Sequence, residues 1–108
     1  MNTLRPVERA YIAGFFDGEG CITHYSNKRG RPRISMGQKE PEVLHRIQTM
    51  LGYGNVRSYS PSNSLHRYWR LDIAREEWMK HFINTVLPYS IVKRKKLREA
   101  KRWFEGRN

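Results

Sequence analysis

The sequence is poor in cysteine and in long apolar runs, and each shortage excludes a class of protein. Cys21 is the single cysteine among 108 residues, so an internal disulfide is impossible and an intracellular protein is favoured over a secreted one. No apolar stretch reaches the length of a membrane span, and no hydrophobic signal segment follows Met1. We therefore expect an intracellular protein that has no membrane partner.

Metal-binding and nucleotide-binding patterns are also missing. The four histidines and the one cysteine lack the spacing of zinc ligands. No glycine-rich phosphate loop is present. These absences disfavour a zinc finger, a histidine-metal nuclease and a nucleotide-binding fold.

Acidic residues are scarce relative to basic ones. Lys and Arg total 21 against 10 Asp and Glu, which gives a formal net charge of +11. Such an excess favours a polyanionic partner, because fixed positive charge attracts phosphate over a range that depends on salt. Charge alone does not separate DNA from RNA.

Hydrophobic periodicity and turn residues predict the order helix–strand–strand–helix–strand–strand–helix–helix. The predicted helices begin near Pro6, at Pro41, before Trp78 and near Ser90. The predicted strands cover residues 21–27, Arg33–Gln38, Asn55–Tyr59 and residues 66–73. We expect a single α+β domain over residues 1–108, in which helices cover one face of a four-stranded antiparallel sheet.

Strand alternation assigns the side chains of this sheet to two faces. The apolar side chains point to the core: Ile22, Ile34, Met36, Val56, Trp69, Leu71 and Ile73. The other face and its turn are polar, aromatic and basic, and we expect them to contact DNA through Thr23, Tyr25, Asn27, Arg29, Arg31, Arg33, Ser35, Asn55, Arg57, Tyr59, His66, Tyr68 and Arg70. Lys95 and Lys96, on the basic side of the last helix, are further candidate phosphate contacts. The alternative is an ordinary solvated sheet face.

The first helix carries small residues at a spacing of four. Ala10, Gly14 and Gly18 leave one helix face nearly bare of side chains. Two such faces could approach each other closely, as small-residue faces do in membrane helices. The alternative is close packing of this face against the chain's own sheet.

Residues 11–20, YIAGFFDGEG, resemble the LAGLIDADG motif of homing endonucleases and related maturases. Residues 12–20 align with the nine motif positions without a gap, and four are identical: Ala13, Gly14, Asp17 and Gly20. Glu19 stands at the second acidic position, where Asp is commoner, and it keeps the carboxylate. The predicted order of elements also matches the αββαββα fold of that family.

The resemblance implies an assembly and a site. A chain with one motif is similar to the single-motif members, which form homodimers through the motif helix. It implies a dimer interface at Ala10, Ala13, Gly14, Asp17 and Gly18. It also implies that Glu19 and the backbone of Gly18 bind Mg²⁺, with Mn²⁺ as a substitute and Ca²⁺ supporting binding without efficient cleavage. Gln38 and Lys93 match a water-ordering polar residue and a basic residue of the catalytic site.

The function implied is that of an intron-encoded homing endonuclease. Such an enzyme makes a double-strand break in a long pseudo-palindromic DNA site by metal-dependent phosphodiester hydrolysis. The resemblance implies that the protein acts inside a cell, where DNA is present: in the cytoplasm or nucleoid, in a phage-infected cell or in an organelle. The alternative is a non-cleaving module on the same fold, either an RNA maturase or a DNA-binding regulator. Glu19, Gln38 and Lys93 together favour catalysis, because a pure binder does not need a carboxylate facing phosphate.

Overall fold

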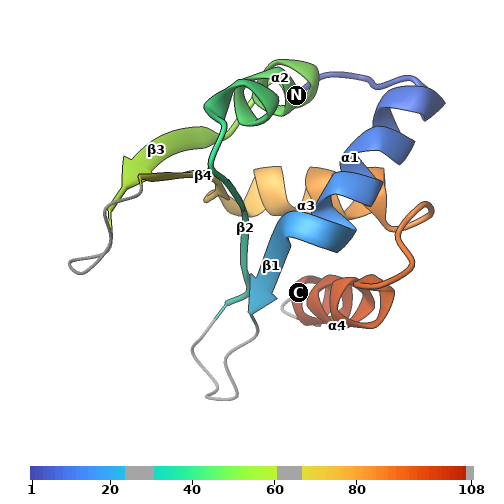
Figure 1. Cartoon of the computed structure of the whole chain (residues 1–108). Coiled ribbons are helices and arrows are strands. Elements are labelled where there is room, and N and C mark those ends of the chain that lie inside the picture. The colour runs from blue at the N-terminus through green and yellow to red at the C-terminus, as the bar shows by residue number, and fades with distance from the viewer. Residues whose placement is uncertain (24–30, 61–66, 107–108) are drawn as a thin grey trace.

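The computed structural model describes residues 1–23, 31–60 and 67–106 (Figure 1). Its elements are α1 (Pro6–Glu19), β1 (Gly20–Thr23), β2 (Arg33–Gln38), α2 (Pro41–Leu51), β3 (Asn55–Tyr59), β4 (Tyr68–Ile73), α3 (Glu76–Val86) and α4 (Arg94–Glu105). This order confirms the predicted one. Within the described ranges no helix is both long enough and apolar enough to cross a membrane.

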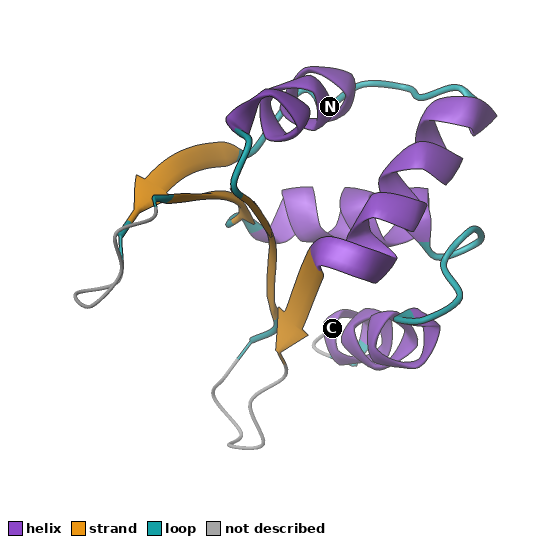
Figure 2. Cartoon of the chain, in the orientation of Figure 1, coloured by secondary structure: helices purple, strands orange, loops and turns teal. Residues whose placement is uncertain are grey.

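The four strands form one antiparallel sheet in the order β1-β2-β4-β3. The helices gather on one side of this curved sheet and leave its other face uncovered (Figure 2). The predicted α+β architecture is therefore confirmed.

The strand register sorts the side chains into alternating rows. Ile22 pairs with Ile34, and Ile34 pairs with Ile73, in a row that faces the helices and is buried. In the adjacent row Cys21 pairs with Ser35, which pairs with Asp72, which pairs with Asn55 on β3, and these side chains point away from the helices. The predicted division between core face and open face is correct wherever the structure describes the strands.

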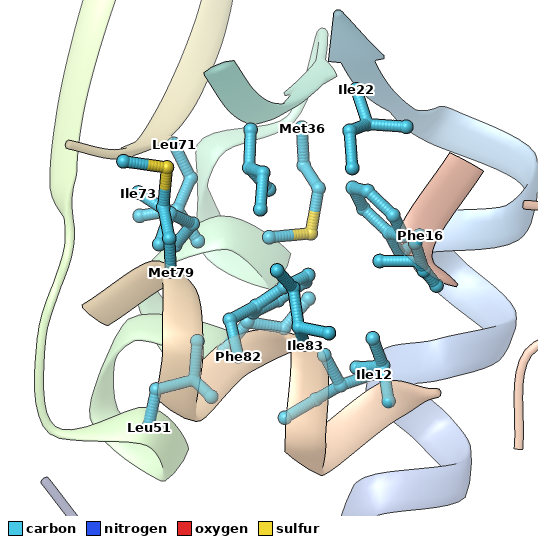
Figure 3. Close-up of a cluster of buried hydrophobic side chains, with 14 of the residues drawn as sticks. Ile12, Phe16, Ile22, Met36, Leu51, Leu71, Ile73, Met79, Phe82 and Ile83 are labelled. Carbon is cyan, nitrogen blue, oxygen red and sulfur yellow. The ribbon is translucent and has the colours of Figure 1, made fainter. Parts of the chain in front are cut away.

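The core lies between the sheet and the helices α1 and α3. Ile12 and Phe16 of α1 meet Phe82 and Ile83 of α3 above Met36 of β2 (Figure 3). The rings of Phe16 and Phe82 pack edge to face, with centroids 5.0 Å apart. These large side chains are almost completely buried, and burial of each stabilises the fold by about 1.5–3 kcal/mol. The core thereby fixes α1 against the sheet.

The inward stripe of α3 differs from the expected one. The apolar pattern predicts a stripe of Trp78, Phe82 and Val86. The structure buries Phe82 and Val86 together with Met79 and Ile83, whereas Trp78 is half-buried and stacks on Tyr53 with ring centroids 5.5 Å apart. The buried stripe of α3 therefore runs through Met79 rather than through Trp78, the neighbouring residue that the apolar pattern predicted.

Three predicted boundaries also differ. Gly18 and Gly20 predict the end of the first helix, but the helix continues through Gly18 to Glu19. The last helix begins at Arg94 rather than near Ser90. The fourth strand begins at Tyr68, and β1 is described only to Thr23. Tyr25, Asn27, Arg29 and His66 lie outside the described residues, so the predictions made for them stand untested.

Candidate functional site

The motif segment forms the C-terminal turns of α1 and the start of β1. Gly20 ends the helix, and its backbone N–H donates to the carbonyl of Phe16. A Cβ atom on Gly20 would collide with the ring and the carbonyl of Phe16, so only glycine fits this turn without a shift. The helix therefore ends with Glu19 exposed next to the sheet.

Gln38 lies close to this helix end in the sheet register. Gly20 pairs with Met36, and the antiparallel register continued outward would bring Glu19 opposite Gly37, the neighbour of Gln38. The Gln38 side chain is half-buried, and its Oε1 accepts a hydrogen bond of 2.8 Å from the backbone N–H of Lys39. Its amide nitrogen Nε2 makes no hydrogen bond to the described part of the chain.

Asp17 fastens the end of α1 to the turn before α4. Its carboxylate accepts hydrogen bonds from the Ser90 hydroxyl and from the backbone N–H groups of Ile91 (2.7 Å), Val92 (3.2 Å) and Lys93 (3.2 Å). Burial alone would raise the pKa of Asp17, but the hydrogen bonds from Ser90 and the three amides outweigh it, and the pKa lies below its ordinary value. This turn is the reason that α4 starts later than the apolar pattern predicts.

The same turn places the ammonium group of Lys93. Lys93 Nζ donates a 2.8 Å hydrogen bond to the backbone carbonyl of Asp17 and lies 5.6 Å from the centroid of the Phe16 ring. The cation is thus held at the last turn of α1, two residues before Glu19. Of the predicted catalytic residues, Glu19 and Lys93 therefore lie at the same end of α1, and Gln38 lies on β2, which pairs with β1.

The outward face of α1 is bare and partly apolar. Ala10, Gly14 and Gly18 are exposed, and a Cβ atom added to either glycine would meet nothing within 4 Å. Val7 and Tyr11 continue this face with 66% and 52% of their surface exposed. The alternative that the small residues pack against the chain's own sheet is therefore wrong.

Two residues predicted for a dimer interface have other positions. The side chain of Ala13 is completely buried in the chain's own core, so it offers no surface to a partner. The carboxylate of Asp17 is committed to the turn at Ser90. The residues with the right surface are Ala10, Gly14 and Gly18, with Ile91 and Val92 of the turn also exposed at 78% and 73%.

The open face of the sheet forms a polar groove with a volume of about 670 Å³. Its lining includes seven of the residues predicted to contact DNA: Thr23, Arg31, Arg33, Ser35, Asn55, Arg57 and Arg70. Among the residues that the structure describes, four arginines and one aspartate supply the charged side chains of this lining. The groove is therefore strongly electropositive, as a phosphate-rich partner requires.

Comparison with known proteins agrees with this geometry. Residues 6–86 match the family model described as the LAGLIDADG-like domain. The chain belongs to this family. No curated protein matches the chain in sequence.

Solved structures of homing endonucleases share the fold. I-CvuI in complex with its target is 23% identical with a TM-score of 0.72, over 89% of this chain and 64% of that one. The archaeal intron-encoded I-Vdi141I complexed with DNA is 23% identical with a TM-score of 0.64, over 89% of this chain and 65% of that one. I-TnaI is 22% identical with a TM-score of 0.68, over 87% and 69%. The chain thus spans slightly less than two thirds of the length of I-CvuI.

The remaining described residues that were predicted to contact DNA are not part of the groove lining. Tyr59 and Tyr68 pair across the neighbouring ends of β3 and β4, with ring centroids 6.1 Å apart. Lys95 and Lys96 are exposed in the first turn of α4, which does not line the groove.

Sequence reasoning missed two features of the site. Asp72 lines the groove but was not among the predicted DNA contacts; its position two residues after Arg70 on the same strand is the signal that could have found it. The link of Asp17 to Ser90 joins residues 73 positions apart, and no local pattern predicts it.

Proposed function

We propose that this LAGLIDADG chain is a site-specific DNA endonuclease that cuts both strands of its target as a homodimer. The observation that carries this proposal is the position of Glu19, exposed where the motif helix passes into the edge strand of the basic groove. Glu19 lies two residues before Cys21, which lines the groove, so its carboxylate would lie near a phosphate backbone held there. I-CvuI and I-Vdi141I, which have the same fold, were solved with DNA.

Double-stranded DNA fits the groove better than a flat anionic surface does. The sheet presents arginines and small polar groups in rows, and these side chains can hydrogen-bond to base edges in a major groove that admits β-strands. Phosphate contacts from the surrounding cations would set the register of the protein on the duplex.

The dimer follows from the bare face of α1. A glycine inside a helix costs about 1 kcal/mol relative to alanine, yet Gly14 has open space around it in the single chain. A second copy of the chain would explain why glycine stands at this position, because two such faces can approach until their backbones are close. A two-fold axis along this face would place both Glu19 carboxylates near each other.

The donor set at Glu19 suits Mg²⁺ shared between two chains and DNA. In the described part of the chain no group of three His, Cys, Asp or Glu side chains could hold a metal alone. Mg²⁺ in phosphate chemistry needs only one or two carboxylates, with water and phosphate oxygens completing its shell. Glu19 and the carbonyl of Gly18 would hold the ion, which would supply an activated water and offset charge on the leaving oxygen. I-CvuI was solved with its target in the presence of Ca, and with the I-CreI target in the presence of Mg with the DNA not cleaved; both structures support the presence of a divalent metal at such a site.

Lys93 and Gln38 would assist at the same helix end. The Lys93 ammonium, held by the carbonyl of Asp17, stabilises negative charge on a phosphate seated at Glu19. The Gln38 side chain can orient water there. Neither residue needs a metal to hold its position in the fold.

The test is incubation with a randomised DNA library in Mg²⁺, followed by sequencing of the cut ends. We expect cut ends that define one long, nearly palindromic site. Glu19→Gln is expected to abolish cutting while DNA affinity stays within about tenfold, because it removes the charge and keeps the shape. Replacing Mg²⁺ by Ca²⁺ should preserve binding with little cleavage, since Ca²⁺ tolerates loose geometry.

Three results would contradict the proposal or its site. Selection of a DNA site without any cleavage in Mg²⁺ or Mn²⁺ would identify a DNA-binding regulator on this fold. Preferential selection of structured RNA over DNA would identify a maturase. Full cleavage by the Glu19→Gln variant would remove Glu19 from the metal site.

A further inference from the structure

Asp72 is the one acidic side chain among the described residues that line the basic groove. It lies at the centre of the open face, opposite Ser35 of β2 and Asn55 of β3. Its side chain keeps 25% of its surface exposed. A carboxylate at this position repels phosphate and so lowers the general affinity for nucleic acid. We therefore look for its role in the recognition of a particular sequence.

Asp72 is in contact with Arg70, two residues earlier on the same face of β4. Arg70 Nε lies 3.0 Å from Asp72 Oδ1, and the Arg70 side chain is 50% exposed. The guanidinium carbon also lies 5.5 Å from the centroid of the Tyr59 ring. A carboxylate on one edge and an aromatic ring on one face together restrict the rotamers of Arg70.

Without Asp72, the Arg70 side chain would face a like charge across the strand pair and would have no fixed orientation. Arg57 is directly opposite it on β3, and like charges opposite each other across a strand pair are destabilising. The carboxylate of Asp72 compensates this repulsion. It also occupies the Nε edge of the guanidinium, so the Nη edge is the one with which Arg70 can bind a ligand.

A guanidinium held in this way is suited to guanine. The O6 and N7 atoms of guanine are two acceptors side by side in the major groove, and they match the two parallel N–H donors of an arginine. A side chain that is already ordered loses less conformational entropy on binding. An unordered arginine, by contrast, binds any nearby phosphate.

We propose that Asp72 is a specificity-determining residue, which orients Arg70 to read one guanine in each half-site and weakens binding to unrelated DNA. This inference rests on the proposed DNA-binding function and adds the base identity and a role for the carboxylate. Asp72 acts through Arg70, so its effect should vanish when Arg70 is absent.

The experiment is selection of bound sites from randomised duplex DNA in Ca²⁺, followed by competition binding at the selected position. For the wild type we expect one position per half-site at which guanine is preferred by about tenfold or more. Asp72→Asn keeps the size and removes the charge, and should reduce that preference roughly two- to fivefold, the range of exposed ion pairs. It should also raise affinity for unrelated DNA.

Two further variants decide whether the effect passes through Arg70. Arg70→Ala should abolish the guanine preference, and adding Asp72→Asn to it should change nothing more at that position. Glu42→Gln is the matched control, because Glu42 is 78% exposed in an ion pair with Arg46 and lies outside the groove lining. It removes the same charge and should leave the base preference unchanged.

The outcomes distinguish a failure of this inference from a failure of the proposed DNA-binding function. If the wild type selects no duplex sequence at all, the proposed DNA function fails. If it selects a site but Asp72→Asn keeps the full preference, or Arg70→Ala keeps the guanine, the inference is wrong. An Asp72→Asn effect that persists in the Arg70→Ala background would equally overturn it.

Discussion

Substitution of Gly14 by alanine should change the stability of the single chain and its self-association in opposite directions. Gly14 lies in the middle of α1, and a Cβ atom added there meets no atom within 4 Å. In the isolated chain, alanine therefore brings higher helix propensity without any clash. If the face of Gly14 is the dimer seam, the same methyl group intrudes between two backbones.

The magnitude for the single chain follows from helix propensity alone. Alanine is favoured over glycine in a helix interior by about 1 kcal/mol. In a domain of this size that corresponds to a rise in the unfolding temperature of roughly 4–8 °C. Gly14→Leu fits the open space of the single chain too, but separates two packed helices much further. A misplacement of about 1 Å at the reacting groups can lower the rate on the order of 10²-fold.

The assay combines thermal unfolding at a concentration where the protein is monomeric with sedimentation on a palindromic DNA site. We expect Gly14→Ala to unfold at a higher temperature and to associate more weakly, and Gly14→Leu to be largely monomeric and inactive. Thr49→Ala is a control on α2, at an exposed helical position where propensity should add about 0.5 kcal/mol and association should not change.

Either of two results would refute this reasoning. A Gly14→Ala chain less stable as a monomer would show that the space beside Gly14 is occupied. A Gly14→Leu chain that dimerises and cuts as well as the wild type would place the dimer seam elsewhere.

Two further predictions concern the turn before α4 and the helix itself. Asp17→Asn should destabilise the fold by about 1–3 kcal/mol at neutral pH, because it weakens hydrogen bonds to a charged group; urea unfolding measures this change. The same variant should lower the cleavage rate, because Lys93 would no longer be held at the end of α1. The pKa of Asp17 is depressed in the fold. Its contribution to the free energy of unfolding is therefore present above the unfolded pKa of about 4 and is lost as the pH falls through the folded pKa. The difference in stability between wild type and variant should shrink on acidification, and a constant difference would contradict this. Lys96→Gln should weaken binding to all DNA sequences alike and reduce the slope of log affinity against log salt by about 1, which a salt titration on specific and random duplexes would show.

The open face of the sheet could be predicted from the sequence because alternation is a strict geometric rule. Ile34 and Met36 must point opposite to Arg33 and Ser35 in any extended strand, and the structure buries the first pair and leaves the second pair at the groove. The motif helix was predictable for a similar reason, since its small residues recur at the helical spacing.

The parts that sequence reasoning missed depend on contacts between distant residues. The start of α4 is set by the bonds from Asp17 to Ser90 and its neighbours, and the helical apolar pattern has no information about them. Ala13 was assigned to the exposed seam with Ala10 and Gly14. The turn of the helix carries it to the buried side instead.

The alternating rows of the sheet also bear on how such a protein could change its target over generations. The residues of the outer row, such as Ser35 and Asn55, stand next in sequence to core residues such as Ile34 and Val56, but on the opposite surface. Ser35 and Asn55 are half-buried and lie outside the core, and substitutions at such surface positions usually alter stability by only about 0.5 kcal/mol or less. On the proposed function, substitutions in the outer row would change the DNA site that the chain recognises, while the core residues on the opposite face of the sheet stay unchanged.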